Sequence, residues 1–377
     1  MKLRVRAYNV EFGDAILISI PEKDQDENEI YKHILIDVGN RGTPNDNRLF
    51  KPVIEDIKKE LNGNPLDLYV MTHEHLDHVQ GLPYAEKKLY GDATVLLDLL
   101  KPRYSWFPVS SDEGSDANLK MGEIKETLET INTYLESVKA MGVPISTHFE
   151  TLWAINNIGR TQDCVDYLLG FQGKSFVHRD FDTKGHHPFL EAEIKIWAPE
   201  NDITTYLTNL TLQSTELKSR TVHLIPPHGV DASAFFELVA SRESFYENLL
   251  AANSSINNTS IVFCIEWHGN RLLFTGDAEE QSWEVMKQSN VLKEVDFLKV
   301  SHHGSHNGTP DPAILDIILP PDSKEGQFAL VSTAENVYDT VPDDETLRII
   351  EERCEKLYRL NEIIPGESQD IFFEPKT

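Results

Sequence analysis

The sequence feature that most constrains the fold is an apolar strand pattern that ends, at three places, on side chains of metal-binding type. Residues 66–71 run into the segment HEHLDH at 73–78, residues 272–274 lead to Asp277, and residues 297–300 lead to a His-His pair. Strands of an α/β sheet can end at a common edge, where such folds place their chemistry. The repetition therefore predicts an α/β chain with one site at its strand ends.

The segment at 73–78 is the most specific motif of the chain. It places His73, His75, Asp77 and His78 within six residues, where one strand-to-helix turn can aim several side chains at a single point. Imidazole nitrogen and carboxylate oxygen suit Zn²⁺, and also Mn²⁺ or Fe²⁺. Because HxHxDH seldom arises by chance, we interpret these residues as metal ligands rather than as solvated loop histidines. Asp277 could bridge two cations, although a strand followed by Gly-Asp is also a common turn.

Both ends of the chain show a regular alternation of strand and helix patterns. Strand-like runs occur at 3–9, 15–20 and 33–38, and a helical apolar stripe occupies 50–61. A later series consists of a hairpin pattern at 260–275, a helix at 279–288, strands at 295–300 and 328–332, and a helix at 343–352. We therefore expect one domain that spans residues 1–377.

Two segments interrupt this alternation. The first, at about 85–190, carries a helical apolar stripe from Ile124 to Val138 and a second helical stretch at about 149–169. The second, at about 200–257, has no clear period and is expected to be irregular. We predict that both segments are insertions into the single domain.

Composition restricts the functional classes. The net charge is −27, from 62 acidic and 35 basic residues, so the surface as a whole should repel polyanions. That argues against non-specific nucleic-acid binding, but not against a small phosphate substrate or a strand held by cations. The three cysteines form no CxxC pair, which favours a reducing compartment. No run approaches the roughly 18–20 apolar residues of a membrane span, so we expect a cytoplasmic protein without membrane contact.

Several motifs together resemble the metallo-β-lactamase superfamily, and within it the metallo-hydrolase domain of ComEC-type DNA-uptake proteins. The matching landmarks are GDA at 13–15, LIDVG at 35–39, THEHLDH at 72–78, IWAP at 196–199, NNTSIV at 257–262, LLFTGDAE at 272–279, LKVSHHGS at 298–305, VST at 331–333, Tyr338 and Tyr358-Arg359. The chain has no membrane segments like those of ComEC-type proteins, so a role in DNA uptake does not carry over.

The resemblance implies a fold and a ligand set. The fold would be a four-layer αββα sandwich, two mixed sheets face to face with helices outside. Two divalent ions would bind, with Zn²⁺ as the first expectation and Mn²⁺ as the alternative. The first ion would be held by His73 and His75, the second by Asp77, His78 and one histidine of the pair, for which we favour His303; Asp277 would lie between the ions. Asp37 would orient the histidine loop from behind.

One histidine that the superfamily usually supplies to the first ion has no counterpart motif here. His178, His186 and His187 in the first insertion, and His223 and His228 in the second, are the candidates. None stands in a supporting motif, and an ordinary surface histidine is the better interpretation of each one alone.

The resemblance favours a hydrolase that cleaves phosphodiester bonds, as a nuclease or phosphodiesterase, with hydroxide activated by two metals. Asp77 would also orient the hydroxide, and His302 would bind a phosphate oxygen or protonate the leaving group. Ser301, Ser305 and His306 would line the site and bind substrate, although simple turn roles are equally compatible with them.

Two other functions remain open on the sequence. The same metals could hydrolyse a small ester, thioester or lactam. Alternatively, the chain could be an effector or interaction subunit of a multiprotein system whose insertions dock a protein partner. A basic-aromatic cluster of Lys101, Arg103, Trp106 and Phe107 could stack the bases of a nucleic acid, although a helix flank packed on the domain is the more ordinary interpretation.

Overall fold

The computed structural model describes the chain except for residues 25, 42–48, 87–99, 208–225, 228, 336, 339 and 377. It contains a seven-stranded and a six-stranded mixed sheet, which confirms the predicted α/β class. The first sheet has the order β13-β1-β2-β3-β4-β5-β6. Its strands are β1 (Leu3–Tyr8), β2 (Ile16–Lys23), β3 (Glu29–Ile36), β4 (Leu68–Val70), β5 (Tyr104–Pro108), β6 (Lys174–Val177) and β13 (Ser368–Phe373). From β3 to β6 the neighbours run parallel.

The second sheet has the order β12-β11-β10-β9-β8-β7. Its strands are β7 (Ala192–Ala198), β8 (Val262–Trp267), β9 (Asn270–Phe274), β10 (Phe297–Lys299), β11 (Phe328–Val331) and β12 (Lys356–Arg359). β9, β10, β11 and β12 are parallel, while β7, β8 and β9 form an antiparallel meander. The parallel pairing brings the carboxyl ends of β9 and β10 to the same edge, as the strand-end pattern predicts.

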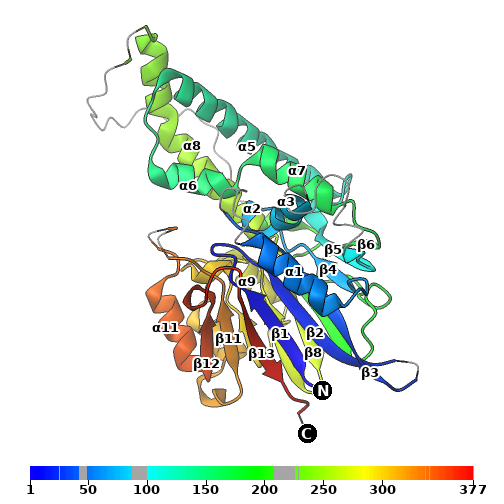
Figure 1. Cartoon of the computed structure of the whole chain (residues 1–377). Coiled ribbons are helices and arrows are strands. Elements are labelled where there is room, and N and C mark those ends of the chain that lie inside the picture. The colour runs from blue at the N-terminus through cyan, green and yellow to red at the C-terminus, as the bar shows by residue number, and fades with distance from the viewer. Residues whose placement is uncertain are drawn as a thin grey trace.

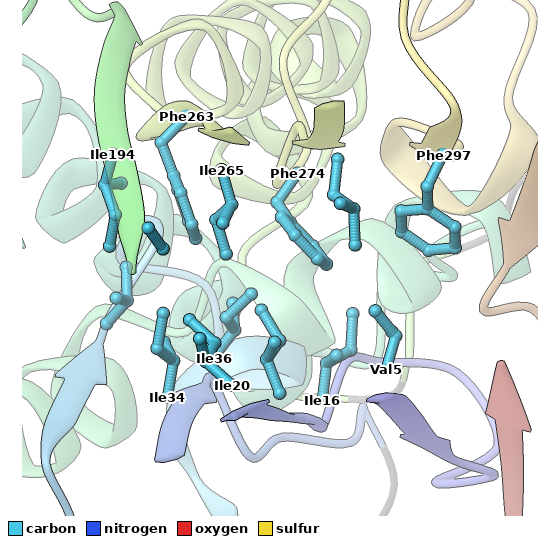
Figure 2. Close-up of a cluster of buried hydrophobic side chains, with 14 of the residues drawn as sticks. Val5, Ile16, Ile20, Ile34, Ile36, Ile194, Phe263, Ile265, Phe274 and Phe297 are labelled. Carbon is cyan, nitrogen blue, oxygen red and sulfur yellow. The ribbon is translucent and has the colours of Figure 1, made fainter. Parts of the chain in front are cut away.

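Apolar side chains of the two sheets meet in a common core. Val5, Ile16 and Ile34 from the first sheet face Phe263 and Phe274 from the second (Figure 2). Successive side chains of a strand point to opposite faces, so the remaining apolar residues of each sheet point outward and are covered by helices. α1 (Phe50–Leu61) packs on the first sheet, and α9 (Glu280–Gln288), α10 (Pro312–Ile318) and α11 (Asp344–Arg353) pack on the second.

Part of the chain forms a helical arm that extends from one end of the sandwich (Figure 1). The arm contains α5 (Asp116–Met141), α6 (Thr147–Ile155) and α8 (Ala232–Asn258), and α7 (Ile158–Leu168) lies at its base. Tyr134 of α5 stacks on Phe245 of α8, with ring centroids 4.1 Å apart. The arm thus has an apolar core of its own, separate from the core between the sheets.

The expectation of an irregular second insertion is wrong, because α8 occupies residues 232–258 of it. The apolar stripe of α8 is interrupted by buried polar residues, among them Asn248, Asn253 and Asn257. These residues weaken the periodicity by which an amphipathic helix is recognised in a sequence.

The first insertion also differs from the purely helical expectation, because β5 and β6 lie within it and extend the first sheet. Lys101, Arg103, Trp106 and Phe107 do not form the base-stacking surface considered in the sequence analysis. Trp106 and Phe107 are fully buried in β5, where the alternation of the strand sends them into the cores on opposite faces. Arg103 pairs with Asp67 at 3.5 Å, and Lys101 is exposed beside it in sequence.

No helix in the described ranges has both the length and the apolar character needed to cross a membrane.

A buried histidine in β3 gives the fold a predicted pH dependence. Burial, reinforced by the charge of Arg4, lowers the pKa of His33 from 6.5 to about 4, while its Nδ1 contacts Ser19 Oγ at 3.1 Å. The unfolded chain binds this proton below pH 6.5, so stability is lost as pH falls from 6.5 towards 4. We expect the metal-free wild type to lose about 2 kcal/mol more unfolding free energy than His33→Gln between pH 7 and pH 5. Urea titrations at both pH values measure the difference, and equal losses would contradict the prediction.

Candidate metal centre

The histidine segment lies on a loop between β4 and the short helix α2 (Leu76–Val79), which is followed by α3 (Gly81–Ala85). Two other loops press against its backbone. A Cβ atom on Gly39 would lie 2.2 Å from the carbonyl carbon of Asp77, and one on Gly13 would lie 2.5 Å from the Asp77 oxygen. Asp14 N also donates to the Asp77 carbonyl at 3.1 Å. Only glycine allows this approach, which fixes the loop that presents the ligands.

Hydrogen bonds at Nδ1 orient two of the histidines, His73 and His78. Asp37 lies at the end of β3 and accepts from Thr72 Oγ1 at 2.6 Å and from His78 Nδ1 at 2.8 Å. Since the Thr72 hydroxyl proton goes to Asp37, Thr72 Oγ1 can accept from His73 Nδ1 at 3.1 Å. In both histidines Nδ1 is therefore the donor, and the lone pair of Nε2 is free.

The other two histidines are held in the same manner from different elements. His303 Nδ1 donates to the Ser332 carbonyl at 2.8 Å, which leaves its Nε2 free. His75 uses the opposite nitrogen, because its Nε2 donates to Asn156 Oδ1 at 3.1 Å and leaves Nδ1 free. Each of the four histidines thus has one nitrogen tied to an acceptor and a second nitrogen turned towards the centre, the arrangement of metal-ligating histidines.

The free nitrogens and two carboxylates face one another at short range. His73 Nε2 lies 3.1 Å from His75 Nδ1. His303 Nε2 lies 3.3 Å from an oxygen of Asp77 and 3.3 Å from one of Asp277, and His78 Nε2 lies 3.3 Å from the same Asp277 oxygen. Two ligands of one tetrahedral Zn²⁺ are separated by about 3.3 Å, given bond lengths of roughly 2.0–2.1 Å. The spacing therefore suits ligands that share an ion.

Burial makes this cluster difficult to explain without a cation. Asp77, His78, Asp277 and His303 are all buried, and their candidate ligand atoms lie within 4.8 Å of one another. Four of their atoms, namely Asp77 Oδ1, His78 Nε2, Asp277 Oδ1 and His303 Nε2, make no well-formed hydrogen bond among the described residues. Buried polar atoms are normally satisfied, so the donor set fits a metal ion.

The electrostatics of the cluster separate neutral from charged histidines. Burial lowers the pKa of His73 well below its ordinary value and that of His75 to about 4, so both are neutral near pH 7. Burial acts in the same direction on His78 and His303, but Asp277 outweighs it. The pKa of His78 is raised well above its ordinary value, and that of His303 is raised to about 9. The carboxylates thus attract positive charge, for which a divalent cation competes with protons.

A buried lysine that the sequence analysis missed lies beside the cluster. Lys299, in β10, contacts Asp14 at 2.5 Å and an oxygen of Asp277 at 3.7 Å, and it donates to the Gly276 carbonyl at 3.2 Å. Its side chain is 1% exposed. The ammonium group therefore balances the charge of Asp14 and lies nearest one oxygen of the Asp277 carboxylate, while His78 and His303 contact the other. Both lysine and aspartate stand in motifs noted above, but their pairing could be seen only in three dimensions.

The turn after β10 separates the two histidines of the pair. His302, His303 and Gly304 have φ angles of 45°, 54° and 80°, a run of left-handed residues that is strained for histidine. His303 consequently faces the cluster, whereas His302 lies with Nδ1 3.3 Å from Glu279 and Nε2 3.3 Å from the Asn257 amide nitrogen.

Asn257 lies in the last turn of α8, next to His302. Its amide nitrogen also donates to Glu279 at 2.7 Å, while its oxygen is buried and accepts no hydrogen bond in the described part of the chain. The amide oxygen is therefore a free acceptor beside His302.

Ser301 and Ser305, two of the residues expected to bind substrate, make hydrogen bonds within the turn. Ser301 Oγ donates to the Ala278 carbonyl at 2.5 Å, and Ser305 Oγ accepts from the Gly308 amide at 3.1 Å. Both hydroxyls are used to shape the turn. His306 is exposed and lines a separate hollow of about 440 Å³ between α9, α10 and α11.

The described candidates for the missing histidine ligand lie elsewhere. His186 contacts Ser175 at 2.8 Å, and the rings of His187 and His178 pack near Trp106 and Phe181 in the connection between β6 and β7. His223 and His228 lie outside the described residues.

Asn156, at the end of α6, is a second residue that sequence reasoning missed. Its Nδ2 donates to the Asn253 side chain of α8 at 2.8 Å, which fixes its Oδ1 towards His75. We expect Asn156→Ala to weaken metal binding about 10- to 100-fold, because His75 loses its orienting partner. Competition with a chelating indicator dye measures this. The neighbouring Asn157 caps α7, so Asn157→Ala should cost about 1 kcal/mol of stability and leave metal affinity unchanged. Equal affinities of the two variants would contradict the assignment.

No protein-family model and no curated protein matches the chain.

Proposed function

We propose that this chain is a binuclear metallo-hydrolase of the metallo-β-lactamase superfamily that cleaves phosphodiester bonds. The observation that supports this most is the set of four buried histidines, each with one nitrogen fixed by an acceptor. The second nitrogens of His73 and His75 face each other, and those of His78 and His303 face the carboxylates of Asp77 and Asp277. A purely structural polar core would pair these lone pairs with donors. The layered sheets and the outer helices are compatible with the αββα fold of that superfamily.

The ligands divide into two sets under this proposal. His73 and His75 would hold the first divalent ion, and Asp77, His78 and His303 the second. Asp277, which contacts His78 and His303, would serve both ions, as the resemblance to the superfamily implies. Zn²⁺ and Mn²⁺ both accept such nitrogen and oxygen ligands.

Two bound cations supply a hydroxide near neutral pH and positive charge opposite the phosphoryl oxygens. Residues of the chain would orient the nucleophile and supply a proton to the leaving group. Asp77 Oδ1, which lacks a hydrogen-bond donor among the described residues, would accept a hydrogen bond from the attacking hydroxide and orient it. As the new P–O bond forms, the bond to the leaving oxygen would break, and His302 in its protonated form would give the proton on Nε2 to that oxygen. Glu279 holds the His302 ring in place from Nδ1.

The choice of phosphodiester over carboxylic ester rests on the ComEC-like motif set, and a direct assay tests it. We expect elemental analysis of the purified chain to find about two metals per chain. The Mn²⁺- or Zn²⁺-loaded protein should hydrolyse bis-p-nitrophenyl phosphate faster than p-nitrophenyl acetate, and chelation should remove both activities. Metal with activity on the acetate alone would favour a small-ester hydrolase. A chain that binds no metal under any loading condition would contradict the proposal.

A further inference from the structure

Arg41 lies on the same loop that presses against Asp77. Its backbone amide donates to the Phe12 carbonyl at 2.9 Å, and its guanidinium carbon lies 5.5 Å from the centre of the Tyr338 ring. The residue is half-buried. A guanidinium stacked on an aromatic face loses rotational freedom while its N–H groups remain available to a ligand.

A short series of aromatic contacts links Arg41 to the candidate metal centre. The Tyr338 ring lies 5.2 Å from that of Phe12, and Phe12 lies 4.3 Å from the ring of His303. Burial raises the pKa of Tyr338, with further contributions from Asp77 and Asp277, while the charge of Arg41 opposes them. The ring contacts through Tyr338 and Phe12 thus connect Arg41 to the His303 side of the centre.

Other cations around the centre already have partners. Lys299 pairs with Asp14, Lys125 pairs with Glu74 at 3.1 Å, and Arg160 donates to Gln80 at 2.8 Å. No carboxylate of the described chain forms an ion pair with Arg41. In a chain of net charge −27, a half-buried guanidinium with no carboxylate partner among the described residues is a candidate for binding an anionic ligand.

We propose that Arg41 is the substrate-binding residue that takes an anionic phosphoryl oxygen of the phosphodiester, and that it thereby selects anionic over neutral esters. This inference rests on the proposed function. The planar guanidinium matches two phosphate oxygens with parallel N–H donors, whereas a neutral carboxylic ester offers no charge to it.

The test compares Arg41→Gln, Arg41→Lys and a charge-matched control. Arg348→Gln removes one positive charge from the exposed face of α11, where Arg348 pairs with Glu345 and Glu352. Metal content is measured first and should be equal in all four proteins. Steady-state kinetics on bis-p-nitrophenyl phosphate and on p-nitrophenyl acetate then follow, with calorimetric titration of inorganic phosphate into the Mn²⁺-loaded proteins.

We expect Arg41→Gln to raise both the KM for the diester and the Kd for phosphate about 10- to 100-fold, the effect of one charge-assisted contact. Values for the acetate should stay within about twofold of the wild type, and Arg41→Lys should be intermediate. Unchanged phosphate binding and unchanged diester KM in Arg41→Gln would overturn the inference, even if the wild type is an active phosphodiesterase. If the wild type cleaves no diester, the proposed function fails, and phosphate affinity alone decides whether Arg41 binds anions.

Discussion

Asp277→Ala is expected to lower bound metal from about two ions per chain to less than one and to reduce diester hydrolysis about 1,000-fold or more. One Asp277 oxygen lies 3.3 Å from the free nitrogens of both His78 and His303. Loss of this carboxylate therefore removes a ligand from the second proposed ion and, under the proposed shared role of Asp277, from the first as well. Elemental analysis after gel filtration and assays with added Zn²⁺ or Mn²⁺ measure the two effects.

The control for this variant is Asp316→Ala. Asp316 is an exposed carboxylate of α10 that pairs with Arg353 at 2.6 Å, and its loss should change neither metal content nor rate. Circular dichroism establishes that both variants are folded. An Asp277→Ala chain that keeps two metals and its activity would remove Asp277 from the centre and contradict the proposed ligand set.

Lys299→Met is expected to destabilise the chain by about 3–5 kcal/mol, the cost of leaving one partner of a buried ion pair alone. Lys299 is buried and lies 2.5 Å from Asp14, which is also buried. Urea unfolding of the metal-free proteins measures the loss. Lys293→Met is the matched control, because Lys293 is exposed and its pair with Glu266 spans 3.5 Å. Lys293→Met should lower the free energy of unfolding by less than about 1 kcal/mol.

The pairing itself is tested by a double mutant. Asp14→Asn combined with Lys299→Met removes both charges, so the pair should recover part of the stability that Lys299→Met loses. A double mutant whose destabilisation equals the sum of the single effects would show that the two groups do not interact. A Lys299→Met variant within about 1 kcal/mol of the wild type would show that the buried charge is compensated in another way.

The strand-end ligands could be predicted from the sequence because each lies within a few residues of the apolar run that positions it. His73, His78, Asp277 and His303 follow β4, β9 and β10, and parallel pairing brings the ends of β9 and β10 together. Local patterns also predict α1 and the hairpin of β8 and β9. These features depend on short-range order, which periodicity and turn residues reveal.

Contacts between distant segments could not be predicted in this way. Asn156 reaches His75 from the end of α6, and Lys299 reaches Asp14 from the other sheet. Neither contact has a local pattern. The sequence left two roles open for Ser301 and Ser305, because a serine near a ligand looks the same in sequence whether it faces substrate or its own backbone. The turn geometry decides between these roles.

The candidate ligands come from both sheets of the sandwich. His73, His75, Asp77 and His78 follow a strand of the first sheet, whereas Asp277 and His303 follow strands of the second. A cation bound between them would be a reversible cross-link joining points roughly two hundred residues apart, in a chain whose three cysteines are all unpaired. It would restrict the unfolded chain as a disulfide does in secreted proteins. Metal supply would then govern the lifetime of the folded molecule as well as its reactivity, and neither half of the chain could acquire the centre without the other.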